Sequence, residues 1–141
     1  MNLASLEAGD ELPALDFGPI SRTTLALFAG ASGDHNPIHI DIDVAKSAGR
    51  PDVFAHGMLS MACLARAVTR SIPQRHLREY GVRFMAITEV GDRIRCTARV
   101  DRIVETSGER LATLSLKVEN QEGRVTLLGS AIVELPAGGE G

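Results

Sequence analysis

The chain places a carboxylate and an imidazole close together on a stretch that cannot be regular helix. Asp34 follows Gly33, His39 lies shortly afterwards, and Asn36-Pro37 stands between them. Gly-Asp and Asn-Pro are turn signals, and a proline disfavours helical geometry in the residue before it. We therefore expect a folded loop that aims both side chains at one point. A carboxylate and an imidazole that share one water are suited to general acid–base chemistry.

Gly57 is the second feature with chemical potential, because it stands at the expected start of an apolar helix. A helix start presents unpaired N–H groups, and glycine has no Cβ to obstruct a substrate carbonyl. The Gly57 N–H is therefore a candidate donor to developing negative charge. Close packing at a helix entrance is the alternative reason for a glycine here. His56, directly before it, is expected to cap or brace the helix start.

Two motifs resemble those of a known family. The first is the run Phe28-x-x-x-Ser32-Gly33-Asp34-x-Asn36-Pro37-Ile38-His39, and the second is Ala55-His56-Gly57-Met58. In order and spacing they resemble the signature of the MaoC-like, (R)-specific enoyl-CoA hydratases, and the similarity extends from about Leu6 to Leu135. One departure concerns the acyl pocket: the family often has a proline shortly after the Arg-Phe of the next strand, whereas Arg83-Phe84 leads into Met85-Ala86-Ile87-Thr88.

The resemblance implies a hot-dog fold, a thioester substrate and a catalytic pair formed by Asp34 and His39. The supporting positions are Ser32, Asn36 and His56, with Asn36 expected to brace the loop more than to hold substrate. The expected reaction is (R)-specific hydration of trans-2-enoyl thioesters, or the reverse dehydration. It needs no metal and no redox cofactor.

Zinc binding is the main alternative for the histidines. His35 and His39 have an i, i+4 spacing, and His56 could add a third ligand. Pro37 makes a regular helix unlikely there, and no cysteine pattern supports a zinc site. The sequence therefore predicts no metal, with His35 facing solvent.

Several residues around the motifs have two interpretations. Arg83 is either a solvated strand residue or a contact for a phosphate of coenzyme A, if the pantetheine leaves past its strand. Met58, Leu59, Met61 and Met85 are expected in the core, with the acyl tail lying against some of them.

Helices are predicted before and after the motifs. Ser21 is a plausible N-cap for a helix that Gly33 ends, and a short helix is expected from Asp41 to Ala48. These pieces form a lid that carries the catalytic loop. The next helix, residues 57–70, is apolar nearly all round and is therefore expected to be buried.

Strands dominate the rest of the chain. Apolar and polar residues alternate over 93–100 and 112–119, and 125–135 continues the pattern. Hairpin turns are predicted at 106–109 and 120–123, and an irregular edge strand within 6–17. The order of elements fits an α+β fold in which an antiparallel sheet wraps around one buried helix.

Length and composition narrow the class of protein. The 141 residues fit one domain, assigned to 1–135, with residues 136–141 as a disordered tail. A net charge of −3 with interspersed signs favours neither nucleic acid nor membrane as a partner, and the beginning of the chain has no targeting pattern. We expect a cytoplasmic protein. Cys63 and Cys96 lie in apolar patterns and are expected to be buried thiols.

Two further functions remain open from the sequence. A hot-dog thioesterase would use the same scaffold to hydrolyse the C–S bond. A non-catalytic subunit of a heteromeric dehydratase would be expected to have lost the pair that Asp34 and His39 retain. Because a single such sheet leaves an edge exposed, a homodimer or another even-numbered assembly is expected. Acyl chain length and the choice between coenzyme A and acyl-carrier protein are not encoded in the motifs.

Overall fold

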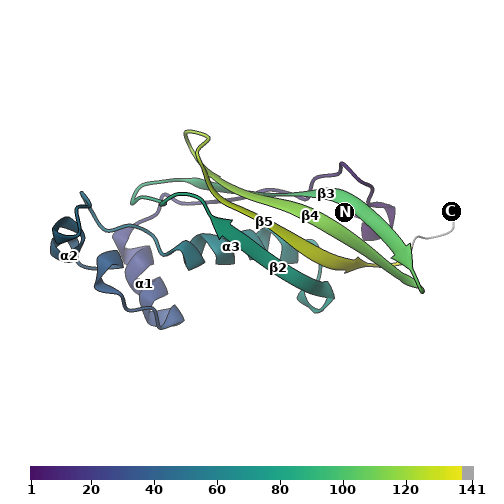
Figure 1. Cartoon of the computed structure of the whole chain (residues 1–141), viewed down its shortest axis with the longest axis horizontal. Coiled ribbons are helices and arrows are strands. Elements are labelled where there is room, and N and C mark those ends of the chain that lie inside the picture. Colours follow the sequence, from purple (N-terminus) through teal and green to yellow (C-terminus); the bar gives the residue numbers. More distant parts are fainter. Residues whose placement is uncertain (138–141) are drawn as a thin grey trace.

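The backbone forms one antiparallel sheet of five strands. A computed structural model describes residues 1–137. The strands lie in the order β1-β3-β4-β5-β2, and Figure 1 shows β3, β4, β5 and β2 of this sheet. Their bounds are β1 Leu15–Phe17, β2 Leu77–Phe84, β3 Ile94–Thr106, β4 Glu109–Asn120 and β5 Val125–Leu135. The short β1 and the longer β2 are therefore the two edges of the sheet.

The alternation expected in the central strands is confirmed. Ile94, Cys96, Ala98 and Val100 are buried on β3, and the residues between them are exposed or half-buried. Beyond Val100 the alternation is lost, although β3 stays paired with β4 as far as Thr106. The strand is longer than predicted because its pairing with β4 continues beyond the alternating region, where most side chains are exposed and Ile103 is half-buried against the core.

Both predicted hairpin turns are present. Ser107 and Gly108 adopt positive φ angles of 49° and 79° between β3 and β4. Between β4 and β5, the Gly123 N–H donates to the Asn120 carbonyl at 3.0 Å. These turns set the antiparallel register of the three long strands.

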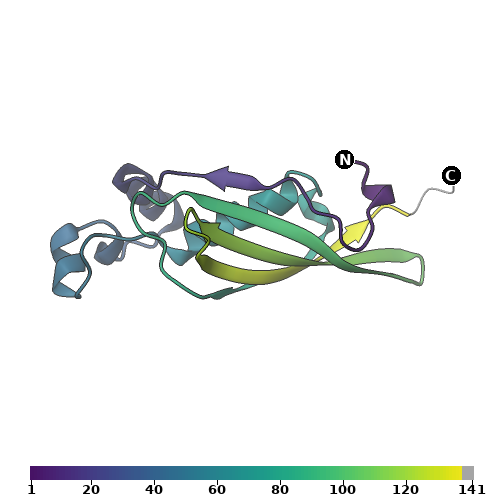
Figure 2. The same ribbon diagram turned by 90° about the horizontal axis from the view of Figure 1, so that it is seen from above.

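The helix α3 (Gly57–Thr69) lies along the sheet and contacts β1, β2, β3 and β4 (Figure 2). Its buried face consists of Leu59, Ser60, Cys63, Leu64, Ala67 and Val68. The expectation of a helix buried all round is wrong, because Met58 is 53% exposed and Ala62 is also exposed. A single sheet covers only one face of the helix.

Three short elements lie beyond one end of the sheet (Figure 1): α1 (Arg22–Ser32), the 3-10 turn η2 (Pro37–His39) and α2 (Ile42–Ser47). α1 and α2 are the predicted lid helices, and η2 lies in the loop predicted between them. The Ser21 hydroxyl accepts the Thr24 N–H at 3.0 Å at the start of α1, and Gly33 ends it with a φ of 77°. This left-handed end of α1 turns the chain toward the 34–39 loop.

Smaller differences from the predictions are local. The segment after α3 is not all strand, since Gln74–His76 forms a 3-10 turn, η3, before β2. Another 3-10 turn, η1 (Leu3–Ser5), precedes β1. Of the tail predicted to be disordered, residues 136 and 137 belong to no strand or helix, and 138–141 lie outside the described residues.

The core between α3 and the sheet is apolar and contains both cysteines as free, buried thiols, as predicted. Burial raises the pKa of both, that of Cys96 to about 12, which keeps the thiols protonated. Among residues 1–137, no helix has the length and apolar character required to span a bilayer. An antiparallel sheet packed along one central helix is the hot-dog arrangement that the resemblance implies, so the predicted fold class is confirmed.

Candidate active site

The loop that follows α1 is held by its own side chains. The Ser32 hydroxyl accepts the Asp34 N–H at 3.2 Å, and Asp34 Oδ1 accepts the Asn36 N–H at 3.2 Å. Asn36 Oδ1 in turn accepts the Ile38 N–H at 3.1 Å and caps η2. Asn36 therefore braces the loop, and the Asp34 carboxylate remains exposed at the end of the lid.

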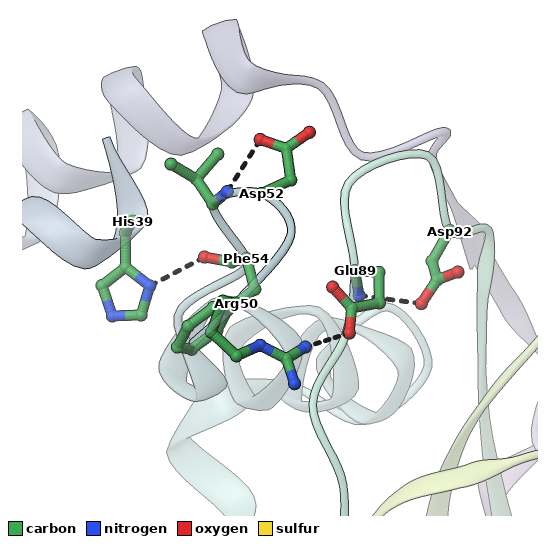
Figure 3. A network of polar contacts seen from close by, with 7 residues as sticks. His39, Arg50, Asp52, Phe54, Glu89 and Asp92 are labelled. Atoms are coloured by element: carbon green, nitrogen blue, oxygen red, sulfur yellow. Dashed lines mark hydrogen bonds and ion pairs between the residues drawn. The ribbon is translucent and has the colours of Figure 1, made fainter. Parts of the chain in front are cut away.

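His39 is oriented by a backbone carbonyl from a distant segment. Its Nδ1–H donates to the Phe54 carbonyl oxygen at 2.7 Å, and its ring meets the Phe54 ring edge-on at 5.0 Å (Figure 3). A carbonyl oxygen can only accept, so the proton of neutral His39 lies on Nδ1. The lone pair of its Nε2 is then available to accept a proton.

His56 lies directly against His39 and is buried. The two imidazoles stack with centroids 3.9 Å apart, and His56 meets Phe28 edge-on at 4.9 Å. Its Nε2–H donates to the Asp34 backbone carbonyl at 3.1 Å. His56 occupies the N-cap position of α3, but its side chain does not cap the helix. It braces the catalytic loop against the helix start.

The pKa of His56 is lowered from its ordinary value of 6.5. The largest cause is burial, and the neighbouring His39 acts in the same direction. The hydrogen bond to the Asp34 carbonyl and the charge of the Asp34 carboxylate oppose the shift. A neutral His56 can lie against His39 without repelling its protonated form.

A carboxylate oxygen of Asp34 and ring nitrogens of His39 and His56 all lie within 4.8 Å of one another. This convergence allows the carboxylate and the imidazole of His39 to share one water molecule. Sequence reasoning had considered His35 as a metal ligand, but His35 is exposed and lies outside this group.

The same three residues are poorly arranged for a metal ion. A metal lies in the plane of each imidazole that binds it. The rings of His39 and His56 are stacked with only 27° between their planes, so one ion cannot lie in both planes at bonding distance. His39 Nδ1 and His56 Nε2 are also engaged with backbone carbonyls.

His39 and Gly57 line the same groove. Its volume is about 520 Å³, and most of its other lining is apolar: Phe54, Ala55, Met58, Phe84, Met85, Ala86, Ile87, Thr88 and Leu127. Gly57 is the first residue of α3, where an N–H has no partner within the helix. The groove is therefore lined by the His39 imidazole, by Gly57, whose N–H has no partner within the helix, and by apolar side chains.

Gly57 is also closely packed. A Cβ at this position would lie 2.7 Å from Cε1 and 2.8 Å from Cδ1 of Phe84. The two interpretations made from the sequence, close packing and a role for the N–H, are therefore compatible. Only glycine, which has no side chain, allows the Phe84 ring to lie over the start of α3.

The prediction that four apolar residues belong to the core holds only in part. Leu59 is buried and Met61 is half-buried against the core, but Met58 and Met85 are 53% and 51% exposed and line the groove. They had been assigned to the core because methionine is apolar. In the structure they lie on the outer side of α3 and just after β2, where the single sheet does not cover them.

Arg83 lies on β2 beside the groove and not in it. It is exposed and lines a neighbouring groove with Gly81, Leu128 and Ser130. The two grooves meet at Met85. A contact between Arg83 and a phosphate of coenzyme A stays a prediction.

Sequence reasoning missed Phe54 as a site residue. Its contribution to His39 is a backbone carbonyl, which no side-chain type encodes. Its position directly before Ala55-His56-Gly57 is the only signal that could have drawn attention to it.

Comparison with known proteins identifies the family of the chain. The family described as "MaoC like domain" matches residues 8–122. The chain is 32% identical over 119 residues to 3-hydroxyacyl-thioester dehydratase Z of Mycobacterium tuberculosis, covering 79% of each protein. It is 29% identical over 139 residues to the (R)-specific enoyl-CoA hydratase of Aeromonas caviae, covering 96% of this chain and 100% of that protein.

Solved structures of hydratases share the fold. The R-hydratase PhaJ1 of Pseudomonas aeruginosa superposes with a TM-score of 0.84 at 28% identity, covering 96% of this chain and 86% of that one. The (R)-hydratase of A. caviae gives a TM-score of 0.81 at 26% identity, covering 94% and 98%. This chain belongs to the MaoC-like domain family.

Proposed function

We propose that the protein is a hydro-lyase that adds water to trans-2-enoyl thioesters to give (R)-3-hydroxyacyl thioesters, or catalyses the reverse dehydration. The observation that carries this proposal is the convergence of Asp34 and His39 beside a groove that Gly57 also lines. The (R) configuration follows the names of the hydratase relatives.

Asp34 and His39 hold and activate one water. The water delivers hydroxide to Cβ of the enoyl group and a proton to Cα from the same face, and the free Nε2 of His39 takes part in this proton transfer. The Gly57 N–H donates to the thioester carbonyl, which becomes negatively charged as the enolate forms. The residues named supply both proton transfer and charge stabilisation, so the step needs no metal or redox cofactor.

The apolar part of the groove suits an acyl chain. Met58, Phe84, Met85 and Ile87 are exposed apolar residues in the free chain, and all four line it. The carrier, coenzyme A or acyl-carrier protein, extends from the open side of the groove, and Arg83, which lines the neighbouring groove, is a candidate contact for its phosphate.

The active assembly is a homodimer or a higher even-numbered homo-oligomer in the cytoplasm. Support for the assembly comes from β2, a long edge strand that pairs on one side only with β5 among the described residues. Exposed apolar residues lie at its end and on the neighbouring strand, namely Phe84, Met85 and Leu128. The structure of the ChsH1–ChsH2 complex of M. tuberculosis shares the fold, with a TM-score of 0.79 at 20% identity.

The test is a panel of enoyl-CoA thioesters of different chain lengths, followed by the absorbance of the conjugated enoyl group. Hydratase activity removes that absorbance without releasing free thiol. Release of thiol from a saturated acyl-CoA would instead identify a thioesterase. A folded protein with neither activity would favour a binding or partner subunit.

A further inference from the structure

The segment 53–56 decides the position of several site groups at once. It supplies the Phe54 carbonyl that accepts from His39, it carries His56, and it leads directly into Gly57. A displacement of this segment would therefore move the hydrogen bond that orients His39. The residues that hold the segment are as important for the site as the residues that line it.

A backbone bridge fastens the segment to the chain that follows β2. Phe54 and Glu89 form an isolated antiparallel bridge, and the Ala55 N–H donates to the Thr88 carbonyl at 2.9 Å. Glu89 is itself fixed, because its N–H donates to Asp92 Oδ2 at 2.9 Å (Figure 3).

Asp92, which accepts the Glu89 N–H, is itself held in place. It is 7% exposed, and its Oδ1 accepts from the side-chain amide of Gln121 at 3.0 Å. The support behind the segment therefore reaches the turn between β4 and β5. A contact with Glu89 therefore connects the segment, through Asp92, to the turn between β4 and β5.

Arg50 makes such a contact from the opposite side. Its guanidinium forms an ion pair with the Glu89 carboxylate, and its Cζ lies 5.3 Å from the centroid of the Phe54 ring (Figure 3). The His39 imidazole also lies against that ring, edge-on at 5.0 Å. Phe54 thus lies in contact with both the guanidinium and the candidate catalytic imidazole.

We propose that Arg50, anchored by Glu89, is a positioning residue that holds Phe54 and thereby orients His39. The expected effect of Arg50 on turnover rests on the proposed function of His39. The expected effect of Arg50 on the orientation of the His39 ring does not rest on that function. The ion pair is partly exposed, with side-chain exposures of 30% and 43%, so its contribution to global stability is small. Its effect is on the geometry of one hydrogen bond.

The experiment combines proton NMR of the His39 Nδ1–H with the kinetics of enoyl-CoA hydration. The signal is assigned by its absence in His39→Gln. Arg50→Met keeps a flexible apolar side chain of similar reach but removes the guanidinium. Glu89→Gln removes the anchor, and Arg50→Lys keeps a cation beside Glu89 and Phe54.

We expect Arg50→Met and Glu89→Gln to shift or broaden the His39 signal. Both variants should also lower kcat about tenfold with KM nearly unchanged, because a misoriented His39 imidazole transfers protons more slowly. The double variant should be no worse than the poorer single one, since the two residues act as a unit. Arg50→Lys should restore most of kcat. Arg95→Met, which breaks an exposed ion pair with Asp16 elsewhere on the sheet, is the matched control and should change neither measurement.

Three results would overturn the proposal: an unmoved His39 signal in folded Arg50→Met, a loss confined to KM, or an equal loss in Arg95→Met. A change in KM alone would mean that the guanidinium binds substrate directly. If Arg50→Met does not fold, Glu89→Gln and Arg50→Lys carry the test. Absence of hydratase activity in the unmodified protein would refute the proposed function, and the NMR measurement would still decide the role of Arg50.

Discussion

Asp34 and His39 have different kinds of support. Asp34 is held by short-range hydrogen bonds within its loop, whereas His39 depends on a carbonyl fifteen residues further along the chain. The pair can act on one water only while both supports are intact.

The first prediction concerns the pair. Asp34→Asn and His39→Gln each keep the size of the side chain and remove its ability to exchange a proton. Each should lower kcat by about a hundredfold or more with thioester binding largely retained, because general acid–base catalysis contributes about that much. The double variant should be little worse than either single variant, since groups that act together lose their effect together.

Steady-state kinetics on variants shown by circular dichroism to be folded would measure these effects. His35→Gln is the matched control, because His35 adjoins Asp34 but is exposed, and it should have normal activity. Near-normal hydration by either variant of the pair would remove that residue from the mechanism.

The second prediction follows from the lowered pKa of His56. Its ordinary value is 6.5, and burial lowers that value in the folded protein, so the unfolded chain binds the proton more readily. The free energy of unfolding should therefore decrease as the pH falls below about 6.5 and continue to decrease until the folded-state pKa is reached. His56→Gln, which keeps a donor for the Asp34 carbonyl but does not titrate, should lose less stability over the same range.

Urea denaturation at a series of pH values between 7.5 and 5, chosen to bracket the value of 6.5, would measure this difference. Identical pH profiles for the two proteins would mean that His56 has the same pKa in the folded and unfolded states.

At the scale of elements, the start of α3 combines the candidate donor N–H of Gly57 with close packing. The helix is positioned by its buried face against the sheet, and its first residue meets the ring of Phe84 from the end of β2. The groove therefore forms partly because the end of β2 lies against the start of α3.

The third prediction is that Gly57→Val lowers kcat about a hundredfold while the protein stays folded, because a side chain there crowds the carbonyl that the N–H must reach. Folding should survive, since the Phe84 side chain is 53% exposed within the single chain and its ring can rotate away from the start of α3. Gly57→Ala should show a smaller loss of the same kind.

Hydration kinetics and thermal denaturation of the same samples separate activity from stability. Gly30→Ala is a suitable control, because a Cβ on this exposed helical glycine has nothing within 4 Å. Full activity of Gly57→Val would disprove the role of the N–H, and an unfolded variant would favour the packing interpretation alone.

At the scale of the whole molecule, β2 pairs on one side only among residues 1–137, and one face of α3 is not covered by the sheet. Met58, Phe84, Met85 and Leu128 are exposed as a result. Exposed apolar residues beside a free strand edge are features of an interface.

The fourth prediction is that light scattering at micromolar concentration gives an even multiple of the chain mass. Met85→Asp should shift the protein toward the monomer, because it places a charge at the end of the free edge. Val104→Asp is the control, since Val104 is equally exposed but lies near the far end of β3. A monomer mass for the unmodified protein would refute the prediction.

The sequence alone determined the features that depend on neighbouring residues. The cap at Ser21, the end of α1 at Gly33, the alternation along β3 and β4 and both hairpin turns were all predicted. These features follow from interactions over a few residues or from the period of a strand. The loop that carries the candidate residues Asp34 and His39 could be singled out for the same reason, since its motif is continuous.

The tertiary structure alone decided the contacts between distant segments. It brought Phe54 to His39, Phe84 to Gly57 and Arg50 to Glu89, and it left Met58 and Met85 exposed when the sequence had assigned them to the core. An apolar residue type shows that burial is favourable, but not which surface is available to cover it. A carbonyl that orients an imidazole is common to every residue, so only the path of the folded chain identifies which one is used.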